Sequence, residues 1–349
     1  MTIPSTGSAP TTPTLHPAPS AVPAPTPAGW FPVERPTLAR GEIDRSEDLR
    51  APERMRAGWP TARVITVDPM GRVEYDATGS RPRLVTVPTD RFGAEPPADA
   101  ILLGAVGGVD HWAVPVPAPE QSGAPDGVLV PGETSGVTRM HLLQIGALLS
   151  DDDAGLLATA TALLNWHQRG AFCPRCGTPS TASPAGWARV CEQGHEEFPR
   201  TDPAVIVLVH DGADRMVLAR QPIWPPGWVS VLAGFVEAGE SLEMTVAREI
   251  KEEVGLDVDQ ITYLTSQPWP APRSLMLGFA ARADPDQPLH PREGEIEQAH
   301  WVTREEVRRM LGEEAMDMTA QPAGSTQRKM LPGAVSIARK LIEGWAALD

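Results

Sequence analysis

The stretch from residue 234 to residue 256 constrains this chain more than any other part of it. It begins with a glycine-rich turn, continues as a predicted helix capped at Ser241, and ends at Gly255. Serine and glycine are the residues preferred at these two helix ends. A stripe of aliphatic residues at helical spacing predicts that the helix docks on a β-sheet. The stripe consists of Val246, Ile250 and Val254.

Three carboxylates lie beside this stripe. Glu249, Glu252 and Glu253 fall within roughly 100° of the helix circumference, because positions i, i+3 and i+4 share a face. Their mutual repulsion costs about a few tenths of a kcal/mol per pair even when they are exposed. A divalent cation would relieve it, and hard oxygen ligands favour Mg²⁺ or Mn²⁺. From the carboxylates alone, a solvated acidic helix face is an equally good alternative.

The complete pattern decides between these alternatives. The stretch matches G-x5-E-x7-R-E-U-x-E-E-x-G-U, where U is aliphatic, at all nine constrained positions. From ordinary residue frequencies, a chance match in a chain of this length is far below one in roughly a hundred thousand. On these residues the chain resembles the Nudix superfamily. The resemblance implies a metal-dependent enzyme that hydrolyses a nucleoside diphosphate linked to another group.

All three cysteines of the chain lie within one window of 19 residues. Cys173 and Cys176 form a C-x2-C pair, and His195 follows Cys191 after three residues. Four such ligands in two pairs are what tetrahedral zinc requires, and a closed four-ligand site is structural rather than catalytic. The alternative is three buried or redox-active thiols with an unrelated surface histidine. The clustering suits metal binding in a reducing compartment, so we expect a cytoplasmic protein.

Other residues narrow the resemblance to one branch of the superfamily. Residues 266–274 read SQPWPAPRS, which is similar to the SQPWPFPxS array of the NADH pyrophosphatase branch. The cysteine cluster upstream, the Phe-Pro-Arg at 198–200 and the Ser-Ile-Ala at 336–338 belong to the same branch. The resemblance implies hydrolysis of NADH or NAD⁺ to nicotinamide mononucleotide and AMP by a homodimer.

The chain divides by composition into five segments. Residues 1–38 hold ten prolines and predict a disordered tail, because such a segment cannot bury enough apolar area to offset its ordering entropy. The other predicted segments are a domain of short strands over 39–150, a linking helix over 151–169 capped at Ser150, a zinc ribbon over 170–200 and a catalytic domain over 201–349. No internal repeat is evident. The resemblance implies an α+β fold, with an N-terminal Nudix-like α/β domain, the ribbon, and a C-terminal Nudix α/β/α sandwich built on a mixed sheet.

Composition excludes several other classes of protein. The net charge is −15 and the pI about 5.0, so the chain has no broad electrostatic footprint for duplex nucleic acid. No apolar run reaches the length of about 18 residues that spans a bilayer. Residues 1–34 contain no Lys or Arg and no sustained apolar core, so they do not resemble a secretory signal.

The resemblance also implies roles for single residues. Glu249, Glu253 and Glu295 would bind the catalytic Mg²⁺ or Mn²⁺ together with the carbonyl of Ala233, and Glu253 or Glu252 would be the general base. Arg248 would orient the carboxylates by ion pairing. The rings of Phe235 and of the partner subunit's Phe198 would enclose the nicotinamide. The rest of the dinucleotide site would be lined by Gln267, Pro268, Trp269, Pro270, Ala271, Pro272, Arg273, Ser274 and Ala338.

The sequence departs from the branch at four positions. Ala271 stands where the family usually has Phe, which removes one wall of the pocket, and Phe198 replaces a common Tyr. His195 replaces the fourth zinc cysteine, with one residue deleted nearby, and Gln298 occupies a position that is often Glu. None of these is an expected ligand of the catalytic metal. Trp269 and its neighbouring prolines could instead form a rigid loop packed on the core.

Two other functions are compatible with the sequence. The substrate could be another nucleoside diphosphate derivative or the NAD cap at an RNA 5′ end, because a cap and one or two nucleotides need little surface. A non-catalytic regulator could sense a nucleotide while the ribbon binds nucleic acid. Such regulators usually lose carboxylates from the acidic helix, and this chain retains all of them.

Overall fold

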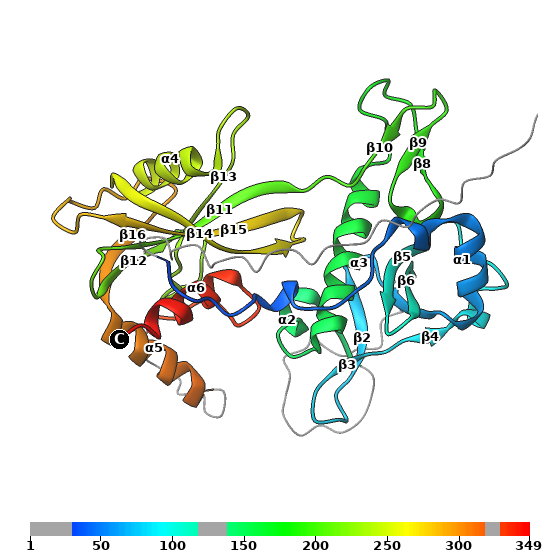
Figure 1. Cartoon of the computed structure of the whole chain (residues 1–349), viewed down its shortest axis with the longest axis horizontal. Coiled ribbons are helices and arrows are strands. Elements are labelled where there is room, and N and C mark those ends of the chain that lie inside the picture. The colour runs from blue at the N-terminus through cyan, green and yellow to red at the C-terminus, as the bar shows by residue number, and fades with distance from the viewer. Residues whose placement is uncertain (1–29, 118–137, 318–328) are drawn as a thin grey trace, which may run out of the picture.

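The computed structural model of the protein describes residues 30–117, 138–317 and 329–349, and Figure 1 shows it as a ribbon. The elements of the N-terminal half are η1 (Thr37–Ala39), η2 (Glu47–Arg50), α1 (Pro52–Gly58), η3 (Trp59–Thr61), β1 (Arg63–Val67), β2 (Arg72–Asp76), β3 (Arg83–Leu84), β4 (Val87–Pro88), η4 (Thr89–Arg91), β5 (Ile101–Val106), β6 (Val109–Pro115), β7 (Thr138–His141), α2 (Leu142–Ile145) and α3 (Asp151–Arg169). The elements that follow are β8 (Ser180–Ala182), η5 (Pro184–Gly186), β9 (Arg189–Cys191), β10 (Glu196–Glu197), β11 (Asp202–His210), β12 (Arg215–Arg220), β13 (Leu232–Phe235), α4 (Leu242–Val254), β14 (Val258–Trp269), β15 (Ser274–Ala283), β16 (Gln298–Thr303), α5 (Arg304–Asp317) and α6 (Ile337–Ala346). None of the helices in these described ranges is long and apolar enough to cross a membrane.

The N-terminal half is built on a seven-stranded sheet. Its strand order is β3-β2-β1-β6-β5, with β4 beside β1 and β7 beside β2. Strands β1 and β6 are parallel, and the other pairs are antiparallel. Side chains alternate between the two faces, so that Ile65 packs towards α3 while Val64 packs towards α1. A separate hydrophobic core therefore lies on each face of this sheet.

Helix α3 belongs to the core of this half. Ser150 caps it by accepting a hydrogen bond from the backbone N–H of Asp153 at 3.1 Å, as the sequence predicted. The helix covers the predicted residues, and its Leu156, Leu157 and Leu163 are buried in the core of the seven-stranded sheet. It has enough apolar residues to cover one face of that sheet.

The predicted disordered tail is shorter than expected at its C-terminal end. Phe31 is 2% exposed and packs in the core around α6, and Leu38 is 3% exposed and packs in the core around α3. The prediction of disorder is therefore wrong for residues 30–38, while residues 1–29 lie outside the described residues. The proline-rich composition was misleading because two isolated apolar side chains find cores distant in sequence.

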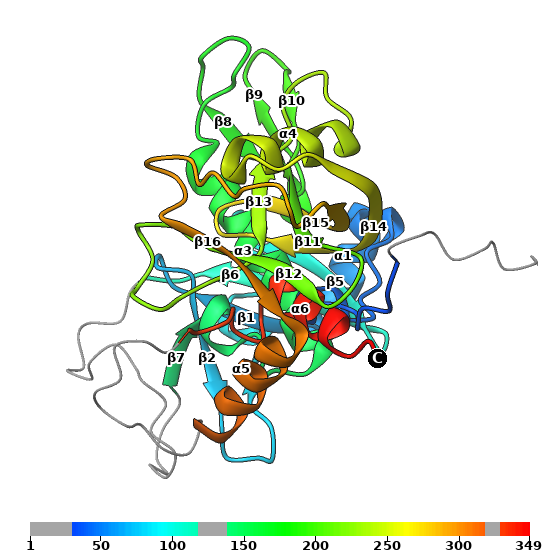
Figure 2. The ribbon, with the colours of Figure 1, turned by 90° about the vertical axis from the view of Figure 1, so that its left-hand side faces the viewer.

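The C-terminal half is built on a six-stranded mixed sheet. Its order is β14-β15-β11-β12-β16, with β13 beside β11, and β11 and β15 are parallel. Helix α4 covers one face, while α5 and α6 cover the other (Figure 2). The predicted α/β/α sandwich is confirmed. Between the two halves, β8, β9 and β10 form a small antiparallel sheet, at the top right of Figure 1.

The two large sheets share one strand arrangement, as the expected pair of Nudix-like domains requires. The order β2-β1-β6-β5 in the first corresponds to β12-β11-β15-β14 in the second, with the parallel pair in the same place. Likewise β4 lies on β1 as β13 lies on β11, and β7 lies on β2 as β16 lies on β12. The expected α+β class, with a Nudix-like domain at each end and the ribbon between them, is thus confirmed.

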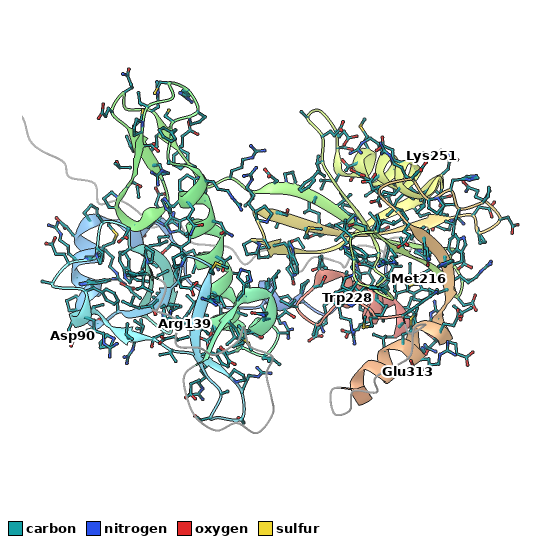
Figure 3. All side chains as sticks on the ribbon, turned by 180° about the vertical axis from the view of Figure 1, so that it is seen from behind. Asp90, Arg139, Met216, Trp228, Lys251 and Glu313 are labelled. Carbon is teal, nitrogen blue, oxygen red and sulfur yellow. The ribbon has the colours of Figure 1, made fainter. Side chains whose placement is uncertain are left out.

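The two halves differ in the segment that precedes the β14–β15 hairpin and in its counterpart, which precedes the β5–β6 hairpin. Helix α4 connects β13 to β14, whereas the corresponding segment between β4 and β5 holds only the short 3₁₀ helix η4. Asp90 of η4 and Lys251 of α4 lie at opposite ends of the molecule (Figure 3). Only the C-terminal half therefore carries the acidic helix.

Candidate active site and zinc centre

Helix α4 is held in place by the features that predicted it. The side chain of Ser241 accepts a hydrogen bond from the backbone N–H of Met244 at 3.2 Å, and Gly255 ends the helix in the left-handed conformation, with φ at +78°. The predicted stripe of Val246, Ile250 and Val254 is fully buried against the mixed sheet. The carboxylates of Glu249 and Glu253 lie next to this stripe, on the side of the helix that faces β13.

Gly234 of β13 makes room for one of these carboxylates. A Cβ atom added at this position would overlap the carboxylate of Glu249. Any other residue would therefore displace Glu249, since interiors leave no space for an extra methyl group. Glycine is required here by a close approach between β13 and α4, and this is the physical reason for the first position of the sequence pattern.

Arg248 binds three carboxylates at once. Its guanidinium donates to both oxygens of Glu240, at 2.6 and 2.9 Å, and to the carbonyl of Phe235 at 2.9 Å. It also lies 2.9 Å from Glu249 and 3.3 Å from Glu252. These contacts raise the pKa of Arg248, and its hydrogen bonds lower the pKa of Glu240 to about 2. Glu240 was identified only as a pattern position, and the structure makes it the residue that fixes Arg248.

Glu253 is the least satisfied carboxylate of the cluster. It is 1% exposed, it accepts a hydrogen bond from the backbone N–H of Ala233, and its Oε2 has no hydrogen-bond partner among the described residues. Burial, followed by the charges of Glu249 and Glu295, raises the pKa of Glu253 to about 8. Burial also raises the pKa of Glu249. A buried carboxylate oxygen without a partner, among other carboxylates, fits a divalent cation.

Arg292 is a member of this cluster that sequence reasoning missed. Its Nη1 lies 3.3 Å from Glu252 and 3.5 Å from Glu295, and its backbone N–H donates to the carbonyl of Glu253 at 2.9 Å. Arg292 lies 40 positions after Glu252 in the sequence, and its two ion pairs bring Glu295 next to α4. No local pattern marks Arg292, because its role depends on a loop that only the fold brings back to the helix.

A cavity of about 190 Å³ opens beside Glu253. We name it the catalytic pocket; of the predicted site residues, Ala233, Glu253, Trp269 and Ala338 line it. Gln221 and Trp224, from the loop after β12, also line it and were not predicted. Two tryptophans among prolines in that loop, at positions 224 and 228, were the signal that could have identified it.

The remaining predicted substrate residues are distributed differently. Gln267 is fully buried, accepts from the backbone N–H of Leu38 and donates to the carbonyl of Val335, so it holds segments together and does not face the pocket. Pro268 is exposed, Pro270 and Ser274 are buried, and Ala271 is half-buried. Phe235 is 57% exposed at the end of β13. The structure does not bring these residues into the catalytic pocket.

A second cavity, of about 270 Å³, contains the other predicted residues. Phe198, Pro272 and Arg273 line it, together with residues of the C-terminal end of α3 and of the zinc ribbon. We name it the ribbon pocket. The motif at 266–274 therefore contributes Trp269 to one pocket and Pro272 and Arg273 to the other.

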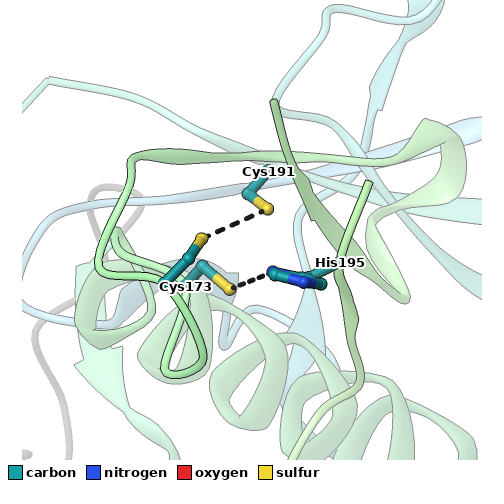
Figure 4. Close-up of side chains that lie close together, drawn as sticks. Cys173, Cys191 and His195 are labelled. Carbon is teal, nitrogen blue, oxygen red and sulfur yellow. Dashed lines mark hydrogen bonds between the residues drawn. The ribbon is translucent and has the colours of Figure 1, made fainter. Parts of the chain in front are cut away.

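The four predicted zinc ligands come together in the ribbon, and Figure 4 shows Cys173, Cys191 and His195 of this group. Their ligand atoms all lie within 4.8 Å of one another. Cys173 Sγ is 3.6 Å from His195 Nδ1, and Cys176 Sγ is 3.8 Å from Cys191 Sγ. Around a tetrahedral zinc with bonds of about 2.3 Å, neighbouring ligand atoms are about 3.8 Å apart. The arrangement fits a structural zinc ion.

Comparisons with known families match three successive parts of the chain. Residues 48–166 match a NADH pyrophosphatase-like rudimentary NUDIX domain, residues 169–198 a NADH pyrophosphatase zinc ribbon domain, and residues 200–321 a NUDIX domain. The order of the three matches is the order of the seven-stranded sheet, the ribbon and the mixed sheet.

Individual proteins also match. The NAD-capped RNA hydrolase NudC of Mycobacterium bovis (strain BCG / Pasteur 1173P2) is 47% identical over 317 residues, which covers 90% of this chain and 96% of the relative. The NAD-capped RNA hydrolase NUDT12 of Macaca fascicularis is 36% identical over 58% of this chain and 43% of the relative. A NUDIX hydrolase from Nitrosomonas europaea has a solved structure with a TM-score of 0.34 and 19% identity, covering 46% of this chain and 96% of that one.

The acidic helix, the cysteine and histidine cluster, the paired sheets and a relative matched over nearly its whole length therefore agree. The chain belongs to the NADH pyrophosphatase family of Nudix hydrolases, in which a zinc ribbon joins a rudimentary Nudix domain to a second one.

Proposed function

We propose that this Nudix hydrolase cleaves the pyrophosphate bond of NADH or NAD⁺, free or as the cap of an RNA 5′ end, at the catalytic pocket. The observation that carries the proposal is the buried Oε2 of Glu253, a residue that lines that pocket; this oxygen has no hydrogen-bond partner in the part of the chain that the structure describes. For a free dinucleotide the products are nicotinamide mononucleotide and AMP. The two named relatives, both NAD-capped RNA hydrolases, support the capped substrate.

The proposed catalytic metal ligands are Glu249, Glu253 and Glu295, with Ala233 beside them. When bound, Mg²⁺ or Mn²⁺ would withdraw charge from the phosphoryl oxygens and lower the pKa of the attacking water. The chain contributes the positioning. Arg248 holds Glu249 from one side at 2.9 Å, and Gly234 leaves the space that its carboxylate occupies. The backbone of Ala233 holds the other oxygen of Glu253.

Glu253 and Glu252 are the two candidates for the general base. Glu252 lies 3.3 Å from both Arg248 and Arg292, and two cations reduce its tendency to accept a proton. Glu253 has no ion pair of this kind among the described residues, and its buried Oε2 has no hydrogen-bond partner there. These contacts favour Glu253, because a general base needs an oxygen that is available to accept a proton.

Two exposed aromatic side chains support the proposed homodimer. Phe235 and Phe198 are 57% and 64% exposed, and a solvent-exposed phenylalanine next to an active site suits stacking on a flat ring. We assign the nicotinamide to the space between Phe235 of one subunit and the partner subunit's Phe198. Three thiols kept as zinc ligands support a reducing compartment, so we place the enzyme in the cytoplasm.

We also propose the five predicted segments as the working division of the chain, with two changes. Residues 30–38 are removed from the tail segment because Phe31 and Leu38 lie in hydrophobic cores, and 151–169 is joined to the N-terminal domain because α3 lies in its core. The unit boundaries would then fall near the ends of α3 and of the ribbon, at residues 169 and 200.

The test replaces Glu253 by Gln, which removes the charge and keeps the shape. We expect the turnover of NADH and of NAD-capped RNA to fall by roughly 10²- to 10⁴-fold, the range for loss of a general base. The matched control is Glu243→Gln, an exposed glutamate in the first turn of the same helix, with wild-type rates expected. Circular dichroism would establish that both variants are folded.

Substrate and metal are compared in the same assay. Rates would be measured on NADH, NAD⁺, ADP-ribose and NAD-capped RNA with Mg²⁺ and with Mn²⁺. Wild-type turnover by Glu253→Gln would refute the assignment of the site, and equal rates on all substrates would refute nicotinamide specificity. Binding without turnover by the wild-type protein would favour the regulator instead.

A further inference from the structure

Apart from Phe198, the residues that line the ribbon pocket have no part in the proposed cleavage of the dinucleotide. It lies where three parts of the fold meet: the C-terminal end of α3, the zinc ribbon and the turn between β14 and β15. The side chain of Asn165 on α3 donates to the carbonyl of Pro270 at 2.8 Å, and this contact holds the turn against the helix. The pocket is thus built by ordered contacts between elements distant in sequence.

Its charge is opposite to that of the whole protein. The chain has a net charge of −15, yet the pocket is lined by Arg169, Arg189, Arg200 and Arg273 and by one carboxylate, Glu197. A concentration of arginines in an acidic protein indicates a local site for an anion.

The partners of these arginines leave positive charge uncompensated. Arg169 forms no side-chain hydrogen bond or ion pair with the residues that the structure describes. The guanidinium of Arg189 contacts uncharged groups of Ser180 and the ring of His167, whose pKa is lowered by burial. Arg200 and Arg273 share a single carboxylate, at 2.6 and 2.7 Å. That carboxylate belongs to Asp202.

Aromatic side chains line the same cavity. Phe172 is 65% exposed, and Trp166 is half-buried on α3. An exposed phenylalanine beside arginines is the combination that binds single-stranded nucleic acid, with bases stacked on rings and phosphates on guanidinium groups. Phe198 also lines the pocket, but it is already assigned to the nicotinamide and is not needed here.

The ribbon pocket is close enough to the catalytic pocket to receive the same substrate. Trp269 lines the catalytic pocket and Pro272 lines the ribbon pocket, and three residues of chain span at most about 11 Å. A strand of RNA that leaves the first pocket reaches the second within a few nucleotides. Free NADH has no such extension.

We propose that the ribbon pocket binds the RNA body of an NAD-capped substrate, with phosphates held by Arg169 and its neighbouring arginines and a base stacked on Phe172. The site rests on the proposed function, because the RNA is the continuation of the dinucleotide in the catalytic pocket. It distinguishes capped RNA from the free dinucleotide, which has no RNA body to reach Arg169 and Phe172.

The test compares two substrates on two variants, Arg169→Gln and Phe172→Ala, in the full-length protein. We expect kcat/KM on an NAD-capped oligoribonucleotide of about ten nucleotides to fall roughly tenfold in each variant, and kcat/KM on NADH to change less than about twofold. For Arg169→Gln the slope of log KM against log salt should shrink by about 0.7, the effect of one lost phosphate contact on a single strand. Arg309→Gln, an exposed arginine on α5, is the matched control and should change neither rate.

The proposal is overturned if the two substrates lose activity equally, or if neither rate changes. Zinc content is measured for each variant, because Phe172 precedes the ligand Cys173 and an indirect loss of zinc would lower both rates together.

A binding measurement separates this proposal from the proposed function. A 5′-monophosphate RNA of the same sequence is titrated into Glu253→Gln protein with and without the two pocket substitutions, and its fluorescence anisotropy is followed. Weaker binding in the pocket variants supports the pocket even if the wild-type enzyme cleaves no capped RNA, in which case only the capped substrate is refuted. Equal binding, together with cleavage of capped RNA by the wild-type enzyme, refutes the pocket alone.

Discussion

The two halves of this protein have the same strand arrangement, but they differ in the segment that carries the acidic helix. Each has a parallel pair at the centre of a mixed sheet, β1 with β6 in one and β11 with β15 in the other, flanked by antiparallel strands in the same order. The C-terminal half places α4 between β13 and β14, and the N-terminal half has only η4 at that point. One connection thus distinguishes a half with an acidic site from a half without one.

The comparison teaches that the sheet supplies a platform and the helix supplies the chemistry. In the C-terminal half Gly234 of β13 admits the carboxylate of Glu249. At the corresponding place in the N-terminal half, β4 carries Val87 and Pro88, and no acidic helix packs over them. The N-terminal sheet instead uses its surface to hold the ribbon, because Trp187 donates to the carbonyl of Leu102 at 2.7 Å.

Removal of zinc is expected to have the largest effect on stability. The effect should be greater in the N-terminal half than in the C-terminal half. Cys191→Ser should abolish zinc binding, since a structural zinc site contributes on the order of 10 kcal/mol of folding free energy. The N-terminal half should lose protection because the ribbon packs on its core through Trp187, whereas β15 should keep it. Zinc analysis and hydrogen exchange of β5 and β15 provide the measurement. Equal loss of protection in both strands would mean that the halves do not differ in this way.

Gly234→Ala tests the close approach of β13 to α4. The added methyl group must displace the carboxylate of Glu249, and we expect kcat on NADH to fall about 100-fold, as for other small misplacements of catalytic groups. The matched variant is Val87→Ala in β4, which removes apolar contacts in the N-terminal core and should lower stability without lowering kcat. Steady-state kinetics and urea denaturation distinguish the two. A fall in kcat for Val87→Ala would show that the N-terminal sheet contributes to catalysis.

The helix caps give the smallest expected effects. Ser241 caps α4 and Ser150 caps α3, each through its side-chain oxygen at the backbone N–H three residues later. Replacement of either by Ala should lower the free energy of unfolding by about 1 kcal/mol. Only Ser241→Ala should also lower turnover, by a few-fold, because α4 carries the carboxylates. A comparable loss of turnover in Ser150→Ala would contradict a division of labour between the halves.

The spacing of residues close together in the sequence predicted the acidic helix and the cysteine and histidine cluster of the ribbon. Ser241 and Gly255 end α4 as predicted, and the two cysteine-containing pairs meet within the distance that zinc requires. Both features depend on residues within a few positions of one another, or on two such groups joined by a short hairpin. Helix α6 is of the same kind, because the side chain of Ser336 caps it.

Other parts of the site depended on contacts across the chain. Arg292 donates to Glu252, which lies 40 positions away in the sequence, and the side chain of Gln267 accepts from the backbone N–H of Leu38, 229 positions away. The motif at 266–274 was read as one binding surface, but its residues alternate between a pocket, the core and a second pocket. No pattern in the motif distinguishes these environments, because they are created by the segments that pack against it.

The amino-acid sequence by itself determined the acidic helix, its ends, the zinc ligands and the family, since hydrogen bonding at caps and the spacing of ligands act over a few residues. Only the tertiary structure decided that an oxygen of Glu253 has no hydrogen-bond partner among the described residues, and that four arginines surround a cavity in an acidic chain. These features arise where segments far apart in the chain exclude water together, and burial of that kind has no local signature.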